Sequence, residues 1–487
     1  MTIAELLRGL KVIRVKGPLE RKIKGIAYDS RHVKDGYLFV AVKGFSVDGH
    51  AYINDAINRG CVGVVVEKTL DLQNKTAFIE VDDSRKTLAF LSSAFYKEPS
   101  KKLSLIGITG TNGKTTTSYI TRDILETWGR KVGLLGTINY VTGKKVLKAT
   151  RTTPESLDLQ RYLREMVDNE VEYAVLEVSS HALALQRVES CSFKVAVFTN
   201  FSRDHLDFHG SMQEYFKAKS TLFNYLGKDD YAVLNWDVPL IRSLKERLNC
   251  NLITCGLGKG SMLKGEDIEQ NGTHGGLSFK IQTPEGRVKA DSVFIGGNNV
   301  YNILMSVGVS YALGISKETI AEGIRKAKPV EGRFEKIEEG QKFLCIVDYA
   351  HTEEALRNLI REARLLTKGK IITVFGCGGD RDRGKRPEMG AAASELSDFV
   401  IITSDNPRTE ESMEIIQEII EGVFKDNYMA EPDRAKAIKE GVSMAKSGDT
   451  LLIAGKGHEN YQEIKGVRYP FSDKEVLKEE IKKRLAV

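Results

Sequence analysis

The sequence predicts an α/β protein with three domains. We expect a small N-terminal α/β domain over residues 1–100, a central P-loop-type, mostly parallel doubly wound domain over 101–330, and a C-terminal Rossmann-like α/β domain over 331–487. The chain has 487 residues, which is about three domains of ordinary length. Strand-like and helix-like segments alternate in two long series. Two polar, proline-containing segments, 95–102 and 327–342, separate the three blocks.

The first two blocks predict a small sheet and then a doubly wound one. The apolar runs YLFVAV, VGVVVE and TAFIEV of the N-terminal block are short enough to be buried strands, and INDAINRG has a helical pattern. In the central block, helices are expected at 115–128, near 157–169 and near 213–226. The strand-like runs between them are LSLIGIT, KVGLLG, EYAVLEV, KVAVFT and YAVLNW. Such alternation requires right-handed crossovers and a parallel sheet covered on both faces.

The C-terminal block repeats this alternation. Its strand-like runs are FLCIV, IITVFG, FVIITS and TLLIAG. Helices are expected at 353–366, near 388–397, near 412–424 and near 435–446. A second doubly wound domain follows from this pattern.

The composition is typical of a globular enzyme with anionic ligands. Charged residues make up 28% of the chain, and the net charge is +6 without a basic stripe interleaved with aromatic residues, so we expect no nucleic-acid partner. The N-terminal segment MTIAELLRGLKVIRVKG carries charges throughout, and no apolar run approaches the about 18 residues of a membrane span. The six scattered cysteines are typical of reduced thiols. We therefore expect a cytoplasmic protein without membrane insertion, and a monomer.

The segment GITGTNGKTTT lies between a predicted strand and a predicted helix. The usual phosphate loop has Gly, four residues and Gly-Lys-Ser/Thr, but Ile108 occupies the place of the first Gly. Strand, glycine-rich turn and helix N-terminus still form a nest of amides for an anion. Lys114 supplies a cation for the terminal phosphates, and Thr115 a hydroxyl for Mg²⁺. A glycine turn with a helix-capping threonine is the structural alternative.

This segment resembles the ATP loop of the Mur ligases and the related folylpolyglutamate synthetases, in which the spacing is shortened in the same way. The resemblance implies ATP contacts from Gly110, Thr111, Asn112, Gly113, Lys114, Thr115 and Thr116. It also implies contacts from Asn299 in an Asn-x-x-Asn pattern, from Arg333 in the linker, and from Asp348.

Acidic and imidazole groups follow two central strands, at the edge where ligands of open α/β sheets bind. Thr115 and Glu177 can hold one Mg²⁺, and His205 with another anion can hold a second. From the residues alone, Lys219 is read as a solvated helix lysine. The resemblance implies instead that Lys219 carries a carbamate and joins the metal ligands. The expected catalytic set is therefore Lys114, Glu177, His205 and Lys219, with ATP and two Mg²⁺ as cofactors.

The resemblance also implies a site for the nucleotide-sugar substrate. In the N-terminal block it assigns Ser30 and Arg31, and in the central block Thr152, Thr153, Ser179 and Arg187. The structural alternatives are an ordinary turn at Ser30, helix capping by Thr153 and an exposed Arg187.

Polar clusters follow all four strand-like runs of the C-terminal block. Because these clusters fall at the same edge of one predicted sheet, they predict a binding face there. The cluster set is similar to the C-terminal domain of the Mur ligase that adds the third amino acid of the peptide. DNPR is the motif of members that add meso-2,6-diaminopimelate. Arg408 can grip the distal carboxylate of that amino acid in a bidentate manner. Asn406 can add a hydrogen bond, Asp405 and Glu459 can hold the distal ammonium, and the resemblance places Arg386 and Gly455 at the same amino acid.

Taken over essentially the whole chain, the resemblance implies an ATP-dependent amide ligase of peptidoglycan precursor synthesis. It would add meso-2,6-diaminopimelate to UDP-N-acetylmuramoyl-L-alanyl-D-glutamate through an acyl phosphate. L-Lysine or D-lysine remains an alternative amino acid, although lysine would leave Arg408 partly unpaired at a cost of about 1 to 3 kcal/mol. Folylpolyglutamate synthetase and a P-loop nucleotide switch are more distant alternatives.

Overall fold

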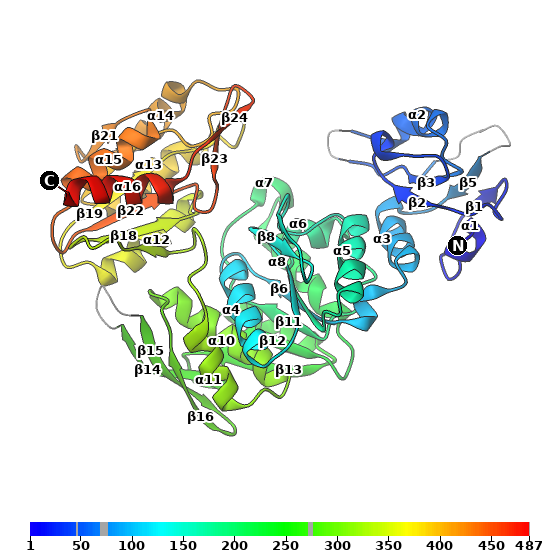
Figure 1. The fold of residues 1–487 in the computed structure, drawn as a ribbon, viewed down its shortest axis with the longest axis horizontal. Helices are drawn as coiled ribbons and strands as arrows, with labels where there is room; N and C mark the ends of the chain where they lie inside the picture. Colours follow the sequence, from blue (N-terminus) through cyan, green and yellow to red (C-terminus); the bar gives the residue numbers. More distant parts are fainter. Residues whose placement is uncertain (45–46, 69–75, 271–275, 487) are drawn as a thin grey trace. The chain divides into compact units, whose positions relative to one another are not determined.

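The computed structural model describes residues 1–44, 47–68, 76–270 and 276–486. The chain divides into two compact units, Met1–Leu263 with Met305–Thr319 and Lys264–Leu304 with Ile320–Val487. Figure 1 shows the course of the chain through both units. Each unit combines helices with a largely parallel sheet, so the predicted α/β class is confirmed. Within the described residues, no helix has both the length and the apolar character needed to cross a membrane.

The first unit begins with a five-stranded sheet of order β1-β5-β4-β3-β2. Strands β2 to β5 are parallel and β1 is antiparallel. Leu38 and Val40 pack into one apolar cluster and Phe39 into another, because both faces of the sheet are covered. The strands and helices are β1 (Arg14–Lys16), β2 (Gly25–Ala27), β3 (Tyr37–Val40), β4 (Gly63–Val66), β5 (Ala77–Glu80), α1 (Ile3–Leu6), α2 (Ile53–Asn58) and α3 (Ser84–Phe95).

The larger sheet of the first unit has the order β13-β12-β11-β6-β10-β7-β8-β9. Its strands are parallel from β13 to β7, and β8 and β9 are antiparallel. The strands are β6 (Ser104–Thr109), β7 (Val132–Leu135), β8 (Asn139–Val141), β9 (Val146–Lys148), β10 (Tyr173–Glu177), β11 (Val195–Phe198), β12 (Tyr231–Asn235) and β13 (Asn251–Gly256). The helices are α4 (Lys114–Thr127), α5 (Ser156–Asp168), α6 (Ser180–Ala184), α7 (Leu206–His209), α8 (Met212–Ser220) and α9 (Pro239–Arg242). Because β10, β6 and β11 are parallel neighbours, the segments that follow them meet at one edge.

The second unit contains an antiparallel set and a largely parallel sheet. The antiparallel strands are β14 (Leu263–Gln270), β15 (Leu277–Thr283) and β16 (Gly286–Asp291). Helices α10 (Gly297–Ala312) and α11 (Lys317–Lys326) each contain residues of both units.

The largely parallel sheet has the order β17-β18-β22-β19-β20-β21, and a hairpin of β23 and β24 follows it in the chain. Its two faces carry separate apolar clusters. The strands are β17 (Glu335–Ile337), β18 (Leu344–Asp348), β19 (Ile371–Phe375), β20 (Phe399–Ile402), β21 (Tyr428–Ala430), β22 (Thr450–Ala454), β23 (Tyr461–Ile464) and β24 (Val467–Pro470). The helices are α12 (Glu353–Leu366), α13 (Lys385–Leu396), α14 (Ser412–Ile420), α15 (Arg434–Met444) and α16 (Asp473–Leu485).

Several elements differ from the sequence prediction, among them a shorter helix and the antiparallel strands β14, β15 and β16. The helix expected near 213–226 ends at Ser220 and continues as a 3₁₀ turn, Thr221–Tyr225. The strands β14 and β16 were not expected, because LKGEDIEQ and GRVKAD are rich in charged residues. These strands bury only part of their side chains, so charges are tolerated along their exposed positions.

Candidate functional site

The loop after β6 has a shape that only glycine permits at two positions. Gly110 has φ of 149°, and a Cβ there would lie 1.9 Å from Thr199 Oγ1; Gly113 has φ of 81° and immediately precedes α4. The segment after β11 holds the loop in place. The Thr111 and Asn112 amides donate to the backbone and side-chain oxygens of Asn200 at 3.0 and 2.7 Å. The loop is thus a fixed turn ahead of a helix N-terminus, as an anion site requires.

Two lysines meet at one carbonyl of this loop. Lys114 Nζ donates to the Gly110 and Thr111 carbonyls at 2.8 and 2.9 Å, and Lys219 Nζ donates to the same Gly110 carbonyl at 2.7 Å. Lys219 comes from α8 and is 1% exposed. The interpretation of Lys219 as a solvated lysine is therefore wrong. Burial, and then the charge of Lys114, hold the pKa of Lys219 well below its usual value, which favours the neutral amine.

A buried carboxylate lies beside the first turn of α4. Glu177, at the end of β10, is 0% exposed, and its Oε2 accepts from the hydroxyls of Thr115 and Thr137, both at 2.9 Å. The Thr137 amide donates to Glu177 Oε1 at 2.9 Å. Thr115 and Glu177 thus offer adjacent oxygen donors, which are the ligands that Mg²⁺ prefers. No three His, Cys, Asp or Glu side chains of the described chain gather around a metal position, so a metal here would depend on phosphate oxygens as well.

Three imidazoles lie next to this cluster. The ring of His181 lies 4.7 Å from that of His205 and 5.7 Å from that of His209. Burial lowers the pKa of His205, and the charges of Lys114 and Lys219 add to the effect. Burial also lowers the pKa of His181 to about 4. His205 is thus favoured as the neutral imidazole, the form that binds metal ions.

The residues assigned to the sugar-peptide substrate in the central block gather at the end of β10. Thr153 Oγ1 donates to the Glu177 carbonyl at 2.8 Å and accepts from the Ser179 amide at 3.1 Å. Arg187 donates to the Thr153 carbonyl at 3.2 Å, and Thr152 lies within hydrogen-bond distance of Thr137. Arg187 is largely buried and pairs with Glu155, so the alternative of an exposed arginine is wrong.

The two residues assigned in the N-terminal block lie together in the 3₁₀ turn Ser30–His32. Ser30 is buried, whereas Arg31 is exposed and grips Asp29 through two nitrogens. This pairing lowers the pKa of Asp29 to about 2. The guanidinium of Arg31 is therefore accessible to an anionic ligand, which would bind it alongside Asp29.

Three predicted ATP contacts belong to the second unit. Asp348, at the end of β18, accepts from the Phe334 and Ala350 amides at 2.7 and 2.8 Å, and burial raises its pKa. Arg333 stacks on the Tyr349 ring, with 4.8 Å between the guanidinium carbon and the ring centroid. Within α10, Asn299 Oδ1 accepts from the side-chain amide of Asn302 at 2.9 Å. Arg333 and Asp348 thus lie in one neighbourhood.

A polar network fixes Asn406 and Glu459 after β20 and β22. Asn406 donates to Glu459 Oε2 at 2.8 Å, and its oxygen accepts from Lys456 Nζ at 3.0 Å and from the Glu463 amide at 2.9 Å. Lys456 is fully buried and also contacts Glu459 Oε2 at 3.1 Å. The Asn406 amide is thus committed to orienting Glu459, which the sequence did not indicate.

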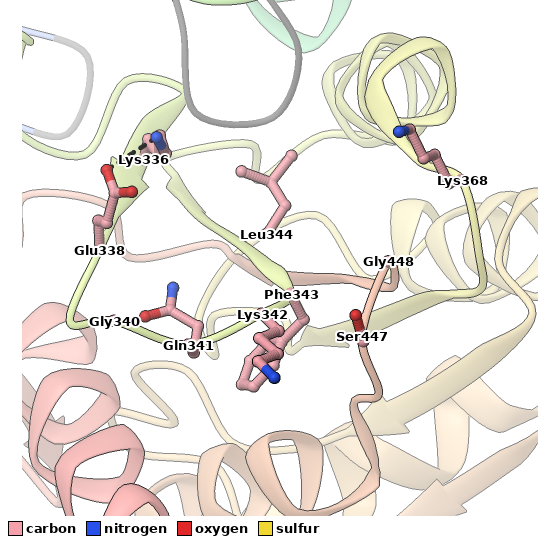
Figure 2. A pocket seen from close by; sticks show the side chains of 10 residues that line it. All are labelled: Lys336, Glu338, Gly340, Gln341, Lys342, Phe343, Leu344, Lys368, Ser447 and Gly448. Atoms are coloured by element: carbon pink, nitrogen blue, oxygen red, sulfur yellow. Dashed lines mark ion pairs between the residues drawn. The ribbon is translucent and has the colours of Figure 1, made fainter.

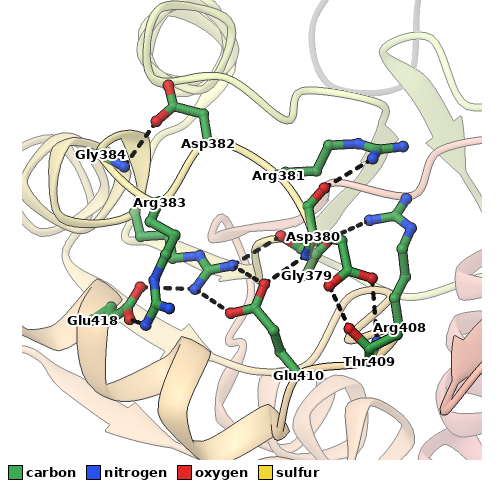
Figure 3. Close-up of polar contacts among 12 residues, drawn as sticks. Gly379, Asp380, Arg381, Asp382, Arg383, Gly384, Arg408, Thr409, Glu410 and Glu418 are labelled. Atoms are coloured by element: carbon green, nitrogen blue, oxygen red, sulfur yellow. Dashed lines mark hydrogen bonds and ion pairs between the residues drawn. The ribbon is translucent and has the colours of Figure 1, made fainter. Parts of the chain in front are cut away.

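Two polar loops, 379–384 and 408–410, are joined by hydrogen bonds (Figure 3), and Arg386 lies in the first turn of α13 just after the first of them. Arg408 donates to the Gly379 carbonyl, and Glu410, in the same loop, accepts from the Asp380 amide. Arg386 is 0% exposed, and its guanidinium binds Glu410 through two nitrogens, both at 2.8 Å, and Glu418 at 2.7 Å. The structure therefore gathers Asp405, Asn406, Arg408, Gly455 and Glu459 at the strand ends, but encloses Arg386 beneath the Arg408 loop, away from a ligand-facing position.

We expect Arg386→Met to lower the free energy of unfolding of the second unit by about 2 kcal/mol, because it removes the buried guanidinium that holds two partly exposed carboxylates in place. Arg386 lowers the pKa of Glu410 to about 2 from 4.5. A lowered carboxyl pKa stabilises the fold above the unfolded value, so the difference between wild type and variant should shrink as the pH falls below about 4.5. Urea unfolding at pH 7 and pH 4 measures both effects.

The matched control is Arg383→Met. Arg383 also pairs with Glu418, but its side chain is 63% exposed (Figure 3). We expect a loss below about 1 kcal/mol from this variant. Equal losses from the two variants would contradict the structural role of Arg386.

The cavity in Figure 2 lies at the edge of the C-terminal sheet where the parallel strands begin, opposite the edge where they end. It measures about 460 Å³, and Leu344, Lys368 and Gly448, which line it, precede or begin β18, β19 and β22. The candidate residues lie at the opposite ends of these parallel strands, since Asp405, Asn406 and Arg408 follow β20 and Gly455 and Glu459 follow β22, so this cavity is separate from them.

Sequence reasoning overlooked several residues of the site. Thr137 follows β7, and Asn200 follows β11, so the rule that polar residues after parallel strands face a ligand would have found both. Arg434 and Asp473, which stand at the first positions of α15 and α16, gave no such signal.

Comparisons with known proteins cover the same blocks. Three family models match: the Mur ligase family catalytic domain at residues 22–96, the Mur ligase middle domain at 108–310, and the Mur ligase glutamate ligase domain at 332–457. The UDP-N-acetylmuramoyl-L-alanyl-D-glutamate--2,6-diaminopimelate ligase of Geobacillus thermodenitrificans (strain NG80-2) is 43% identical over 99% of this chain and 99% of its own length.

Solved structures resemble the chain over its length. A structure of a UDP-N-acetylmuramoyl-L-alanyl-D-glutamate--2,6-diaminopimelate ligase superposes with a TM-score of 0.70 and 29% identity, covering 100% of this chain and 99% of its own. The MurF ligase of Thermotoga maritima, solved in complex with ADP, superposes with a TM-score of 0.65 and 23% identity, covering 95% and 99%.

Proposed function

This chain belongs to the Mur ligase family, and from that premise we propose that it uses ATP to join meso-2,6-diaminopimelate to UDP-N-acetylmuramoyl-L-alanyl-D-glutamate. The identity of 43% to a ligase named for these substrates supports the choice of reaction. The observation that carries the proposal is a pair of neighbouring contacts. Lys114 and Lys219 both bind the Gly110 carbonyl, and Thr115, the residue after Lys114, binds Glu177. Such a cluster suits phosphoryl transfer to an acyl group.

The reaction has two steps. The D-glutamyl carboxylate attacks the γ-phosphorus of ATP, forming an acyl phosphate and releasing ADP. The amine of the amino acid then attacks the acyl carbon, the carbon–oxygen bond to phosphate breaks, and the amine loses a proton. Phosphorylation is needed because a carboxylate repels nucleophiles and has no leaving group.

The residues divide this work. Lys114 balances charge on the terminal phosphates, and the loop from Gly110 to Thr116 cradles them. Thr115, Glu177, His205 and Lys219 as its carbamate would hold up to two Mg²⁺. When bound, the metal neutralises phosphate charge and polarises the acyl oxygen. Burial lowers the pKa of Lys219 and so favours its neutral amine, which is the form that reacts with CO₂; this supports a carbamate.

The other assignments are part of the same proposal. Asn299, Arg333 and Asp348 contact ATP, while Thr152, Thr153, Ser179 and Arg187, with Ser30 and Arg31, contact the nucleotide-sugar peptide. The domains divide at about 1–100, 101–330 and 331–487, for the uridine nucleotide, ATP and the amino acid respectively. We place the enzyme in the cytoplasm as a monomer.

Arg408 selects the amino acid. Its guanidinium lies at the strand ends together with Asp405 and Glu459, so a zwitterion with a distal carboxylate and a distal ammonium matches both signs of charge. A lysine substrate has the distal ammonium but no distal carboxylate for Arg408. Asn406 and Lys456 hold Glu459 in the position from which it would bind that ammonium.

We expect Arg408→Lys to reduce the preference for meso-2,6-diaminopimelate over L-lysine by about 10- to 100-fold, because lysine at this position cannot form the bidentate pair. Competition between the two amino acids, with products separated by mass, measures this ratio. Arg468→Lys on the exposed hairpin is the matched control and should leave the ratio unchanged. An unchanged ratio in Arg408→Lys would contradict the assignment.

The function itself is tested by omitting one substrate at a time from a phosphate-release assay. We expect phosphate only when ATP, the muramoyl dipeptide and the amino acid are all present. Strong hydrolysis without the amino acid would favour a nucleotide switch. Turnover with a folate in place of the muramoyl dipeptide would favour a folylpolyglutamate synthetase.

A further inference from the structure

A buried ion pair lies behind the candidate amino-acid site. Arg434 begins α15 and Asp473 begins α16, and both side chains are 0% exposed. Arg434 Nε and Nη2 donate to the two oxygens of Asp473 at 2.7 and 2.8 Å. Burying two charges costs free energy, and apolar residues of similar volume often replace such a pair without loss of stability. The pair therefore requires an explanation beyond stability.

The remaining donors of Arg434 bind two loops of the site. Nη1 donates to the Ser404 carbonyl at 3.1 Å, and Nη2 to the Ala454 carbonyl at 2.9 Å. These carbonyls immediately precede Asp405 and Gly455. The loops follow β20 and β22, which lie on either side of β19 rather than next to each other. One guanidinium thus joins the backbones of two loops that no strand pairing connects.

The two loops come very close at this point. A Cβ on Gly455 would lie 2.7 Å from Asp405 Oδ2 and 3.8 Å from Arg434 Nη2. Burial opposes the charge of Arg434, but Asp473, Asp405 and Glu459 favour it, and its pKa is raised above the usual value. The positive charge of Arg434 therefore also lies within reach of the two acidic residues that face the amino acid.

We propose that Arg434, oriented by Asp473, is a positioning residue that sets the separation of the Asp405 and Glu459 loops and thereby the affinity for the amino acid. This inference rests on the proposed function. Arg434 touches no substrate in this account, since it is fully buried beneath the loops. It acts by holding two carbonyls and both oxygens of Asp473 at once, four hydrogen bonds that a rigid planar fork of donors makes and the three donors of an ammonium cannot.

The test uses the double variant R434M/D473L, which removes both charges together and so leaves none unpaired. We expect its KM for meso-2,6-diaminopimelate to rise about tenfold or more, because small displacements of binding groups have large effects. The KM values for ATP and the muramoyl dipeptide should change by less than about twofold. R434K, which keeps the charge but not the fork, should raise the amino-acid KM by a smaller factor.

The matched control is R364M/D398L. This pair also joins an arginine to an aspartate, at 2.7 Å, and Arg364 also donates to two backbone carbonyls, those of Gly369 and Leu396. It lies at the opposite end of β19, because the Ile371 amide donates to Asp398. The control should leave the amino-acid KM unchanged.

The outcomes are distinct. An unchanged amino-acid KM in R434M/D473L, or equal rises in all three KM values, would overturn the positioning role. If the double variant does not fold, R434K decides: a selective rise supports the role and no rise overturns it. Failure of the wild-type enzyme to turn over meso-2,6-diaminopimelate would instead overturn the proposed function.

Discussion

Lys114→Ala is expected to lower kcat for phosphate release by about 10³-fold. Lys114 is held over the loop by the Gly110 and Thr111 carbonyls, so its charge is in place before ATP arrives. Charge that develops on the transferring phosphoryl group would lose this preorganised partner. Initial rates of phosphate release at saturating substrates measure the loss.

The control for this variant is Lys217→Ala. Lys217 lies on α8, its side chain is 75% exposed, and it pairs only loosely with Glu214 at 3.5 Å. We expect activity close to that of the wild type. A loss of less than tenfold in Lys114→Ala would mean that the loop does not bind the reacting phosphate.

Lys219→Ala is expected to lower kcat by about 10²- to 10³-fold, and added formate or acetate should restore part of the activity. The alanine side chain leaves room for a small carboxylate, whose oxygens take the place of the carbamate. The Gly110 carbonyl, which Lys219 contacts at 2.7 Å, locates this space beside the phosphate loop. Rates measured with and without formate test the prediction.

Two controls accompany this variant. Formate should not raise the rate of Lys114→Ala, because that variant lacks a cation rather than an anion. The intact wild-type enzyme should gain the mass of one CO₂ in bicarbonate and lose it after exhaustive removal of CO₂. Full activity of Lys219→Ala without added carboxylate would show that Lys219 supplies no metal ligand.

The repeating strands and helices were predictable because their burial is unambiguous. The runs at β6, β10 and β19 are mostly apolar and are buried along nearly their whole length, since both faces of these strands are covered. The antiparallel strands β14 and β16 escaped prediction because charges occupy their exposed positions. The end of the helix at Ser220 was missed because a 3₁₀ turn continues the same apolar pattern.

Within the site, the rule that ligands bind after parallel strands located Glu177 and Asp405 from the sequence. The sequence could not indicate which charged side chains are buried. Lys219 looks like a solvated helix residue but binds the Gly110 carbonyl, and Arg386 was expected at the amino acid but binds Glu410 and Glu418. The hydrogen-bond partners of Arg434 likewise lie 20 to 39 positions away in the chain, so its positioning role could not be inferred from the local sequence.

Activation of the D-glutamyl carboxylate as an acyl phosphate at the Lys114 loop requires transfer of one carboxylate oxygen to phosphate. A muramoyl dipeptide labelled with ¹⁸O in both oxygens of this carboxylate tests the transfer. The carboxylate oxygen that attacks phosphorus leaves with the phosphate, so we predict one ¹⁸O in each phosphate released and the other in the new amide. Phosphate without ¹⁸O, formed together with the amide, would contradict the account.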